Sequence, residues 1–250
     1  MNRVKKELPK YKHAWPLLYF FIYLPWFLIL EQKITPDYAG LHIIHCPLDD
    51  MIPFCEWFVI PYLIWFLYIP AVFLFLFYHS KKEFYRMCAY EFTGMTIALI
   101  VYTVFPNGLN LRLTDIGRNN ILVTIVQFLY ASDTPTNVCP SIHVFATISA
   151  HLKLFFCKEA HLCLVKSKHM QKLNSRKRIK KVSWVLTVLI CLSTVFLKQH
   201  SVIDLICGAI LSIGLYFVVF KWWFGKVKFP APNVKDPRKH EVLYFLNKKK

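Results

Sequence analysis

The chain has 250 residues, of which 56% are apolar, 17% are aromatic and only 18% are charged. Soluble domains carry about 25% charged residues, so this composition argues against a soluble single domain. The chain also carries 31 Lys and Arg residues against 14 Asp and Glu residues, a formal net charge of +17. In a soluble protein this excess would indicate a nucleic-acid partner. The arrangement of the apolar residues explains the charge differently.

The apolar residues form blocks long enough to cross a bilayer, whose core requires about 20 apolar residues per helix. The sequence predicts six spans, at residues 14–30, 57–78, 92–111, 138–157, 182–197 and 202–220. The shorter block 121–131 predicts an interfacial or re-entrant helix. The first block reads either as a cleavable signal peptide or as an anchor. We expect a retained anchor, because no small-x-small cleavage site follows it.

Most Lys and Arg residues fall in four segments: the N-terminus, the turn at residues 81–86, the loop 158–181 and the tail from residue 221. Basic residues in short loops accumulate on the cytoplasmic side. We therefore expect a multi-pass protein of the plasma membrane with both termini in the cytoplasm. The basic loops would contact anionic lipid head groups, and no nucleic-acid partner is expected. Residues 1–224 are predicted to form one membrane domain, and residues 225–250 a basic cytoplasmic tail.

Polar and ionisable residues gather in three segments on the predicted outer side, where such groups are costly and indicate function. Seven of them are candidate site residues: Arg112, Arg118, Ser141, His143, Lys198, His200 and Asp204. Nearby, Asp49 and Asp50 form either a substrate-access loop or, in the simpler reading, a solvated turn. The oxidising outer side would also permit one disulfide among Cys46, Cys55 and Cys139.

The segment Pro140-Ser141-Ile142-His143 predicts the start of a helix, because proline suits the first helical turn. The free N–H groups of that turn form an anion site. Ser141 would add a hydroxyl donor there, and His143 a proton donor. The alternative is that Ser141 is a cap and His143 only its neighbour.

His200 and Asp204 are four residues apart, which places both on one face of a helix. The carboxylate can fix one imidazole nitrogen and leave the other free to attack. A structural His–Asp pair is the alternative. The guanidinium of Arg112 can hold phosphate oxygens through two parallel hydrogen bonds; the alternative is that it extends toward lipid head groups. Together these residues suit phosphoryl transfer through a phosphohistidine, without a metal ion or cofactor.

At these residues the sequence resembles the type 2 phosphatidic acid phosphatase superfamily. The family motif Pro-Ser-Gly-His is similar to residues 140–143, and the motif Ser-Arg, five residues, His, three residues, Asp is matched by Ser193, His200 and Asp204. Of the family's first motif, Lys, six residues, Arg-Pro, only Arg112 is present. Four positions depart from the pattern: Phe105, Leu113, Ile142 and Thr194 stand where the family has Lys, Pro, Gly and Arg. The local sequence is most similar to the branch that contains inositol-phosphoryl-ceramide synthases.

The resemblance implies an all-α membrane bundle of six helices with a core like that of acid phosphatases and vanadium haloperoxidases. It implies a lipid phosphatase or phosphotransferase with an extracytoplasmic site, acting on a phosphorylated lipid. His200 would be the nucleophile, Asp204 its orienting group and His143 the acid and base. Arg112 and Ser141 would bind phosphate, with Lys198 or Arg118 replacing the missing cations.

Two other classes of protein fit the same residues. One is a catalytically weakened relative that binds or carries a phosphorylated lipid without turnover. The other is a haem or metal protein with His143 and His200 as axial ligands, which would leave Asp204 and Arg112 without a role. The sequence does not determine the lipid, the acceptor or the oligomeric state.

Overall fold

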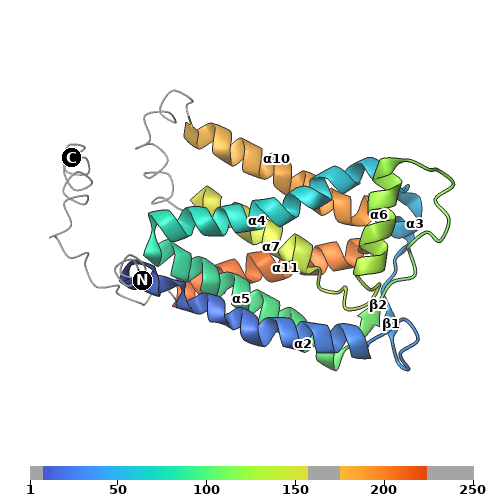
Figure 1. Cartoon of the computed structure of the whole chain (residues 1–250), viewed down its shortest axis with the longest axis horizontal. Helices are drawn as coiled ribbons and strands as arrows, with labels where there is room; N and C mark the ends of the chain where they lie inside the picture. The colour runs from blue at the N-terminus through green and yellow to red at the C-terminus, as the bar shows by residue number, and fades with distance from the viewer. Residues whose placement is uncertain (1–7, 157–174, 224–250) are drawn as a thin grey trace.

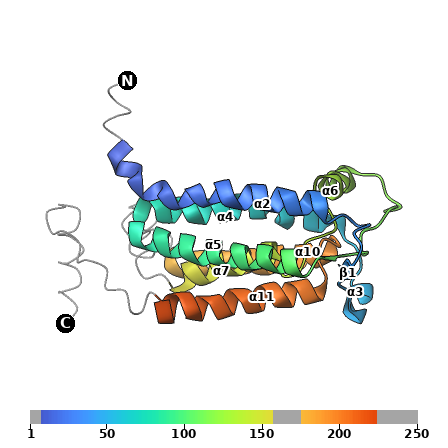
Figure 2. The same ribbon diagram turned by 90° about the horizontal axis from the view of Figure 1, so that it is seen from below.

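A computed structural model describes residues 8–156 and 175–223. The long helices lie side by side in a bundle, and short elements and loops gather at one end of it (Figures 1 and 2). The predicted tail 225–250 and most of the basic loop 158–181 lie outside the described residues. The described elements are η1 (Leu8–Tyr19), α2 (Phe20–Lys33), β1 (His42–Ile43), α3 (Pro47–Met51), η2 (Glu56–Phe58), α4 (Val59–His79), α5 (Lys81–Val104), β2 (Asn107–Gly108), α6 (Ile121–Ser132), α7 (Ile142–Phe156), α10 (Ser175–Phe196), α11 (Val202–Tyr216) and η3 (Phe217–Trp223).

Five helical segments of the described chain are long and apolar enough to cross a membrane: Tyr11–Lys33, Glu56–His79, Lys81–Val104, Arg178–Phe196 and Val202–Phe220. They correspond to five of the six predicted spans and suggest a multi-pass membrane protein. The remaining prediction, 138–157, falls on α7, which has 15 described residues. Six spans are therefore not confirmed.

The third predicted span has the wrong bounds, because α5 begins at Lys81 and ends at Val104 rather than covering 92–111. Charged residues in its first turns are accommodated because they pair inside the bundle. Glu83 accepts from Arg86 at 3.0 Å and also from Lys153. At the other end, Pro106 disfavours helical geometry at Phe105, which has left the helix at φ −134° and ψ 76°.

Helix α6 lies across the end of the bundle rather than along it (Figures 1 and 2). It covers Ile121–Ser132, which confirms the short apolar helix expected at 121–131. Asn120 caps it by accepting a hydrogen bond from the Val123 N–H at 3.0 Å. Val123 and Val126 are buried, whereas Ile121 and Phe128 are exposed on its other side. The helix thus covers the end of the bundle with one face and leaves an apolar face outside.

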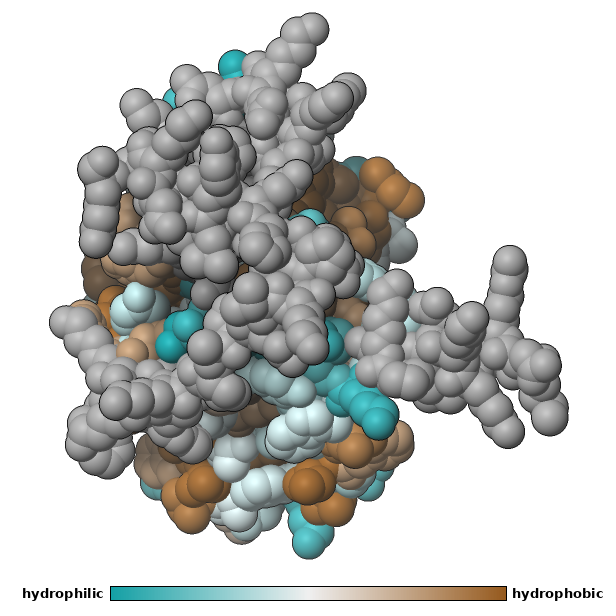
Figure 3. All heavy atoms as spheres, turned by 90° about the vertical axis from the view of Figure 1, so that its left-hand side faces the viewer, coloured by the Kyte–Doolittle hydropathy of each residue, from teal (hydrophilic) through white to brown (hydrophobic). Residues whose placement is uncertain are grey.

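Helix α7 lies inside the bundle, in contact with α4, α5, α10 and α11. By contrast, the outer helices expose large apolar side chains, including Phe21 at 78% and Leu67 at 73%. Brown apolar side chains also lie at the periphery in the view onto one end of the bundle (Figure 3). Exposed apolar surface of this extent is unusual for soluble monomers and suits contact with lipid.

A short parallel pair, β1 and β2, joins distant segments at the end of the bundle where α3 and α6 lie. His42 pairs with Asn107 and Ile43 with Gly108, while Gly108 also bridges to Thr136. The segments around Gly108 and Pro135 approach so closely that a Cβ on Gly108 would lie 2.9 Å from the carbonyl oxygen of Pro135. The segment that leads to Arg112 and the segment that leads to Ser141 and His143 are thereby held together at this end.

Candidate active site

The two candidate histidines and the carboxylate meet at the end of the bundle, at the starts of α7 and α11. His143 Nδ1 lies 3.3 Å from His200 Nε2, and His200 Nδ1 lies 3.4 Å from Asp204 Oδ2. His200 and Asp204 are 7% and 0% exposed. The residues come from segments about 60 positions apart, so the fold itself brings them together.

The contacts favour one arrangement of the donor and acceptor nitrogens on the two rings. Asp204 Oδ2 lies 3.4 Å from His200 Nδ1, which is an ion-pair distance rather than a hydrogen bond. Because a carboxylate can only accept, it favours a proton on Nδ1 and a lone pair on Nε2 of His200. His143 then donates from Nδ1 to that lone pair and accepts at Nε2 from the Tyr62 hydroxyl, 3.1 Å away. A nucleophilic nitrogen and a neighbouring N–H proton are the components that nucleophilic catalysis with acid and base assistance requires.

Tyr62 and Trp65 are site residues that the sequence did not single out. Both lie on α4 and pack against the His143 ring, with centroid distances of 5.1 Å and 4.5 Å. Tyr62 is 2% exposed. In the sequence they belong to an apolar span, where an aromatic residue most simply indicates packing, and no local signal marks them.

Asp204 and Asp49 both hold the first turn of α11. Ser201 is the N-cap of α11, and Asp204 Oδ2 accepts from the Ser201 N–H at 2.9 Å. Asp49 accepts from the Ser201 hydroxyl at 2.6 Å and from the Val202 N–H at 2.8 Å. Carboxylates are stabilising at this end of a helix, where the N–H groups are unpaired. The turn that carries His200 is thus fixed on two sides.

Asp49 is 2% exposed, so the expected solvated turn is wrong for this residue and fits only Asp50. Burial alone would raise the pKa of the Asp49 carboxyl, but hydrogen bonds from Ser201, Val202 and Cys46 together lower it below its ordinary value. Its position three residues after Cys46, as in a capping box, is the signal that could have indicated a structural carboxylate.

Ser141 lies at the start of α7 and is fully buried. Its hydroxyl accepts from the Val144 N–H at 3.3 Å, and its own N–H donates to the carbonyl of Asp204 at 3.2 Å. Gly208 permits this close approach, because a Cβ there would lie 2.6 Å from the Ser141 carbonyl oxygen. Ser141 therefore acts as a helix cap that joins α7 to α11, and its hydroxyl hydrogen is still available to a ligand.

Arg112 lies beside the site, but oxygen atoms of the protein occupy four of its five N–H groups. Nη1 donates to the carbonyls of Tyr130 and Asp133 at 3.1 Å and 2.5 Å. Nη2 donates to the carbonyl of Thr134 at 3.0 Å and to Gln199 Oε1 at 2.6 Å. Nε is buried and has no partner among the described residues. A two-pronged grip on phosphate is therefore not open to Arg112 in this arrangement.

The acidic neighbour of Arg112 is Asp133, whose carboxylate lies 3.7 Å from Nη2. Burial raises the pKa of the Asp133 carboxyl above its ordinary value, and the attraction of Arg112 offsets this only in part.

The two cations expected to replace the missing family residues have other partners. Lys198 is 7% exposed, and its Nζ donates to the carbonyls of Asp49 and Ile52, both at 2.6 Å. Its backbone is left-handed at φ 55°, which costs a non-glycine residue roughly 1–2 kcal/mol and closes the turn after α10. Arg118 donates to both carboxylate oxygens of Glu56 at 2.9 Å and 3.2 Å. Both cations contact protein oxygens in place of an anion.

Asn107 and Glu31 hold the segment that leads into α7. Asn107 is fully buried, and its Oδ1 accepts from the N–H groups of Val138 and Cys139 at 2.9 Å and 2.8 Å. Glu31, at the end of α2, accepts from Asn137 Nδ2 at 2.7 Å. Sequence reasoning missed both roles, because neither residue stands near a histidine in the chain.

A protein-family model matches part of this chain. Residues 120–228 match the PAP2 superfamily. The matched part includes His143, His200 and Asp204, whereas Arg112, Tyr62 and Asp49 precede it. Comparisons with curated proteins and with solved structures give no match. The PAP2 match and the apolar helices together suggest a membrane protein of phosphatase type.

The described residues offer no support for a metal site or for a disulfide. Within residues 8–156 and 175–223, no group of three or more His, Cys, Asp or Glu side chains could hold a metal ion. The cysteines considered for a disulfide, Cys46, Cys55 and Cys139, are all free.

Proposed function

We propose that the protein is a membrane enzyme that cleaves or transfers the phosphate ester of a lipid through a phosphohistidine on His200. The observation that carries the proposal is the row of contacts from Tyr62 through His143 and His200 to Asp204. The PAP2 match over residues 120–228 supports the same reaction class.

In the first step, His200 Nε2 attacks phosphorus and forms an N–P bond, while the ester oxygen leaves and takes a proton from His143, which enters this step as the imidazolium and leaves it as the neutral imidazole. Asp204 stabilises the positive charge that develops on His200. The rings must move apart, because 3.3 Å between the nitrogens leaves no space for phosphorus. In the second step, His143 accepts the proton of an incoming hydroxyl as its oxygen displaces His200. Water as acceptor gives a phosphatase, and an alcohol gives a transferase like those of the branch noted above.

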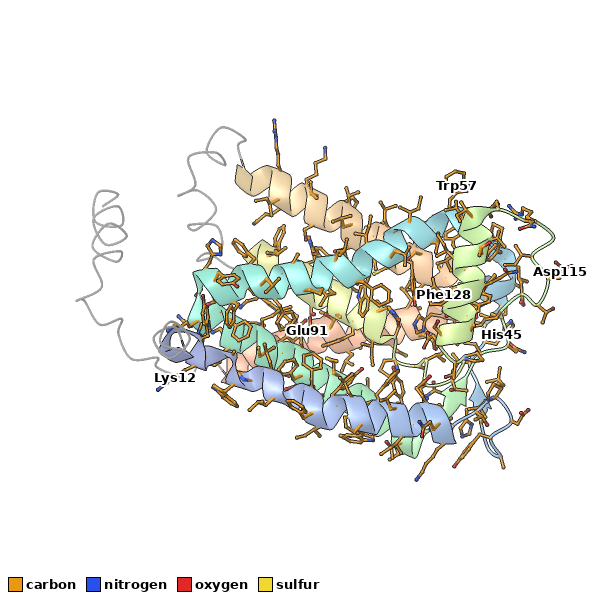
Figure 4. The ribbon with its side chains drawn as sticks, in the orientation of Figure 1. Lys12, His45, Trp57, Glu91, Asp115 and Phe128 are labelled. Atoms are coloured by element: carbon orange, nitrogen blue, oxygen red, sulfur yellow. The ribbon has the colours of Figure 1, made fainter. Side chains whose placement is uncertain are left out.

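We further propose that the site faces the extracytoplasmic side of the plasma membrane. Lys12 lies at one end of the bundle, whereas His45 and Asp115 lie at the opposite end (Figure 4). The turn before α5, with Lys81 and Lys82, lies at the same end as Lys12 (Figure 1). Basic residues favour the cytoplasmic side. The basic end would contact anionic lipids, and the site would take its phosphorylated lipid from the outer head-group region.

A second candidate is a relative that binds a lipid phosphate without turnover. The observation that favours it is the engagement of Arg112, Lys198 and Arg118 by protein oxygens, which leaves few charges for a transition state.

The test is phosphate release in membranes from phosphatidate, prenyl diphosphates and phosphatidylglycerol phosphate. Wild type, His143→Ala and His200→Ala are compared, with His45→Ala as the control, because His45 is exposed at the same end and pairs only with Asp50 among the described residues. We expect release by wild type and the control, with both site variants at least about 1,000-fold slower. Turnover retained in both site variants would refute the mechanism. Saturable binding of phosphorylated lipid without turnover in any variant would support the second candidate.

A further inference from the structure

Gln199 immediately precedes His200 in the chain, and the nitrogen of its side-chain amide makes no hydrogen bond to a described residue. The residue is 2% exposed, and Nε2 has no hydrogen-bond partner among the described residues. The amide group NH₂ carries two N–H donors. Buried donors are nearly always paired in native proteins, so an exception beside a reactive group requires an explanation.

The orientation of this amide is determined by its neighbour. Arg112 Nη2 donates to Gln199 Oε1 at 2.6 Å. A guanidinium carries donors only, so turning the amide over would place N–H groups against N–H groups. The oxygen therefore faces Arg112, and the two amide hydrogens face elsewhere. The backbone is fixed as well, because the N–H groups of Gln199 and His200 both donate to the carbonyl of Thr194, at 2.9 Å and 3.0 Å.

We propose that Gln199 Nε2 donates to a non-bridging oxygen of the phosphoryl group at His200, and that Arg112 is a positioning residue for this amide. This inference rests on the proposed function, because it assigns a further ligand in the same site. The proposed contact gives the amide hydrogens of Gln199 a partner. It also explains why the Nη hydrogens of Arg112 donate to oxygen atoms of the protein and not to a ligand. Arg112 still contributes its charge, and its Nε–H is the single donor that it has left.

Local charges are consistent with an anion at this place. Asp133 is the acidic group nearest Arg112, and it lies 3.7 Å from Nη2 on the side of the α6–α7 connection. Asp204 Oδ2 accepts from the Ser201 N–H and lies 3.4 Å from His200 Nδ1, whereas its Oδ1 has no hydrogen-bond partner among the described residues. A neutral donor such as Gln199 binds phosphate without adding a cation that would attract these carboxylates.

The experiment measures inhibition by orthovanadate, which mimics the transferred phosphoryl group, in purified protein with Gln199→Met and Gln199→Glu. The Met variant keeps the length of the side chain and removes the donor. The Glu variant keeps the contact with Arg112 as an ion pair and replaces the donor by a negative charge. Gln127, exposed on α6 at the same end of the bundle, provides the controls Gln127→Met and Gln127→Glu.

We expect the inhibition constant of orthovanadate to rise about 10-fold in Gln199→Met and about 100-fold in Gln199→Glu, because a hydrogen bond to a charged group is worth one to two decades of affinity. The controls should change by less than twofold. Arg112→Lys should weaken inhibition in wild type but have little further effect in Gln199→Met, because it acts through the amide. A purely structural role would lower the melting temperature and leave inhibition unchanged.

Inhibition within twofold of wild type in both folded Gln199 variants would overturn the inference. If one variant does not fold, the other decides alone. Should wild type release no phosphate, the proposed function fails, and direct calorimetric binding of orthovanadate decides the inference separately. Binding by wild type that Gln199→Met weakens tenfold supports the ligand role, and equal binding by both overturns it.

Discussion

Asp49 offers the sharpest test of how the His200 turn is held. The change Asp49→Asn keeps the size of the side chain but removes one acceptor oxygen. In the structure Oδ2 accepts from the Ser201 hydroxyl at 2.6 Å and from the Cys46 N–H at 2.8 Å. A hydrogen bond to a charged group contributes about 1.5–3 kcal/mol, so the loss of two should lower the free energy of unfolding by about 3 kcal/mol or more.

The measurement is denaturant unfolding of purified protein in detergent, at neutral and acidic pH. Because hydrogen bonding holds the pKa of Asp49 below its ordinary value, its ionised form stabilises the fold above the pKa of an unfolded aspartate, about 3.9. This stabilisation is lost as pH falls through the folded pKa. The difference between wild type and Asp49→Asn should therefore be full at pH 7 and shrink in acid.

The neighbouring change Asp50→Asn is the matched control. Its carboxylate is 67% exposed and pairs with His45, so its loss should cost no more than about 1 kcal/mol. Equal stability losses in the two variants, or a difference that does not depend on pH, would refute the reasoning. Asp49→Asn should also reduce kcat, because the Ser201 hydroxyl loses its acceptor and the His200 turn is then held less firmly.

Two further predictions concern the hydroxyl of Tyr62 and the close contact of Gly208 with the start of α7. Tyr62→Phe removes the hydroxyl that donates to His143 Nε2 and should reduce kcat about 10- to 100-fold with little change in KM. Tyr78→Phe, at an exposed position of the same helix, should change neither constant. A drop in KM alone in Tyr62→Phe would contradict the proposed role of the Tyr62 hydroxyl. Gly208→Ala places a Cβ 2.6 Å from the Ser141 carbonyl and should lower the free energy of unfolding by about 1–3 kcal/mol, as thermal melting would measure. Gly214→Ala has open space in the same helix and should stabilise or leave the protein unchanged, so similar losses in both would exclude the close contact as the cause.

Spacing along the chain predicted the local geometry around His200 and the start of α7, but not the full set of residues that meet there. The four-residue interval between His200 and Asp204 places them on one helical face, and Pro140 indicates the start of α7, so both depend on local geometry. The apolar blocks likewise predicted five of the spans, because burial in lipid requires a minimum length of apolar helix.

The remaining features depend on contacts between distant segments. The start of α5 was missed because the buried Glu83 is paired in part with Lys153, 70 residues away. The role of Arg112 could not be predicted, because three of its four partners are backbone carbonyls, which every residue carries. Asp49 was misread for the same reason, since its partner Ser201 lies 152 residues further along the chain.

The hydrogen bonds of Asn107 and Glu31 limit how far the part of the chain that carries His143 and His200 can be separated from the rest. Both residues precede the part that matches the PAP2 superfamily, yet they satisfy the amides of residues 137–139 at the threshold of α7. A fragment of residues 120–228 would retain both imidazoles. It would lack the oxygen atoms of Asn107 and Glu31 that accept hydrogen bonds from residues 137–139. Moving residues 120–228 into another protein would therefore also require the preceding segments that carry Glu31 and Asn107.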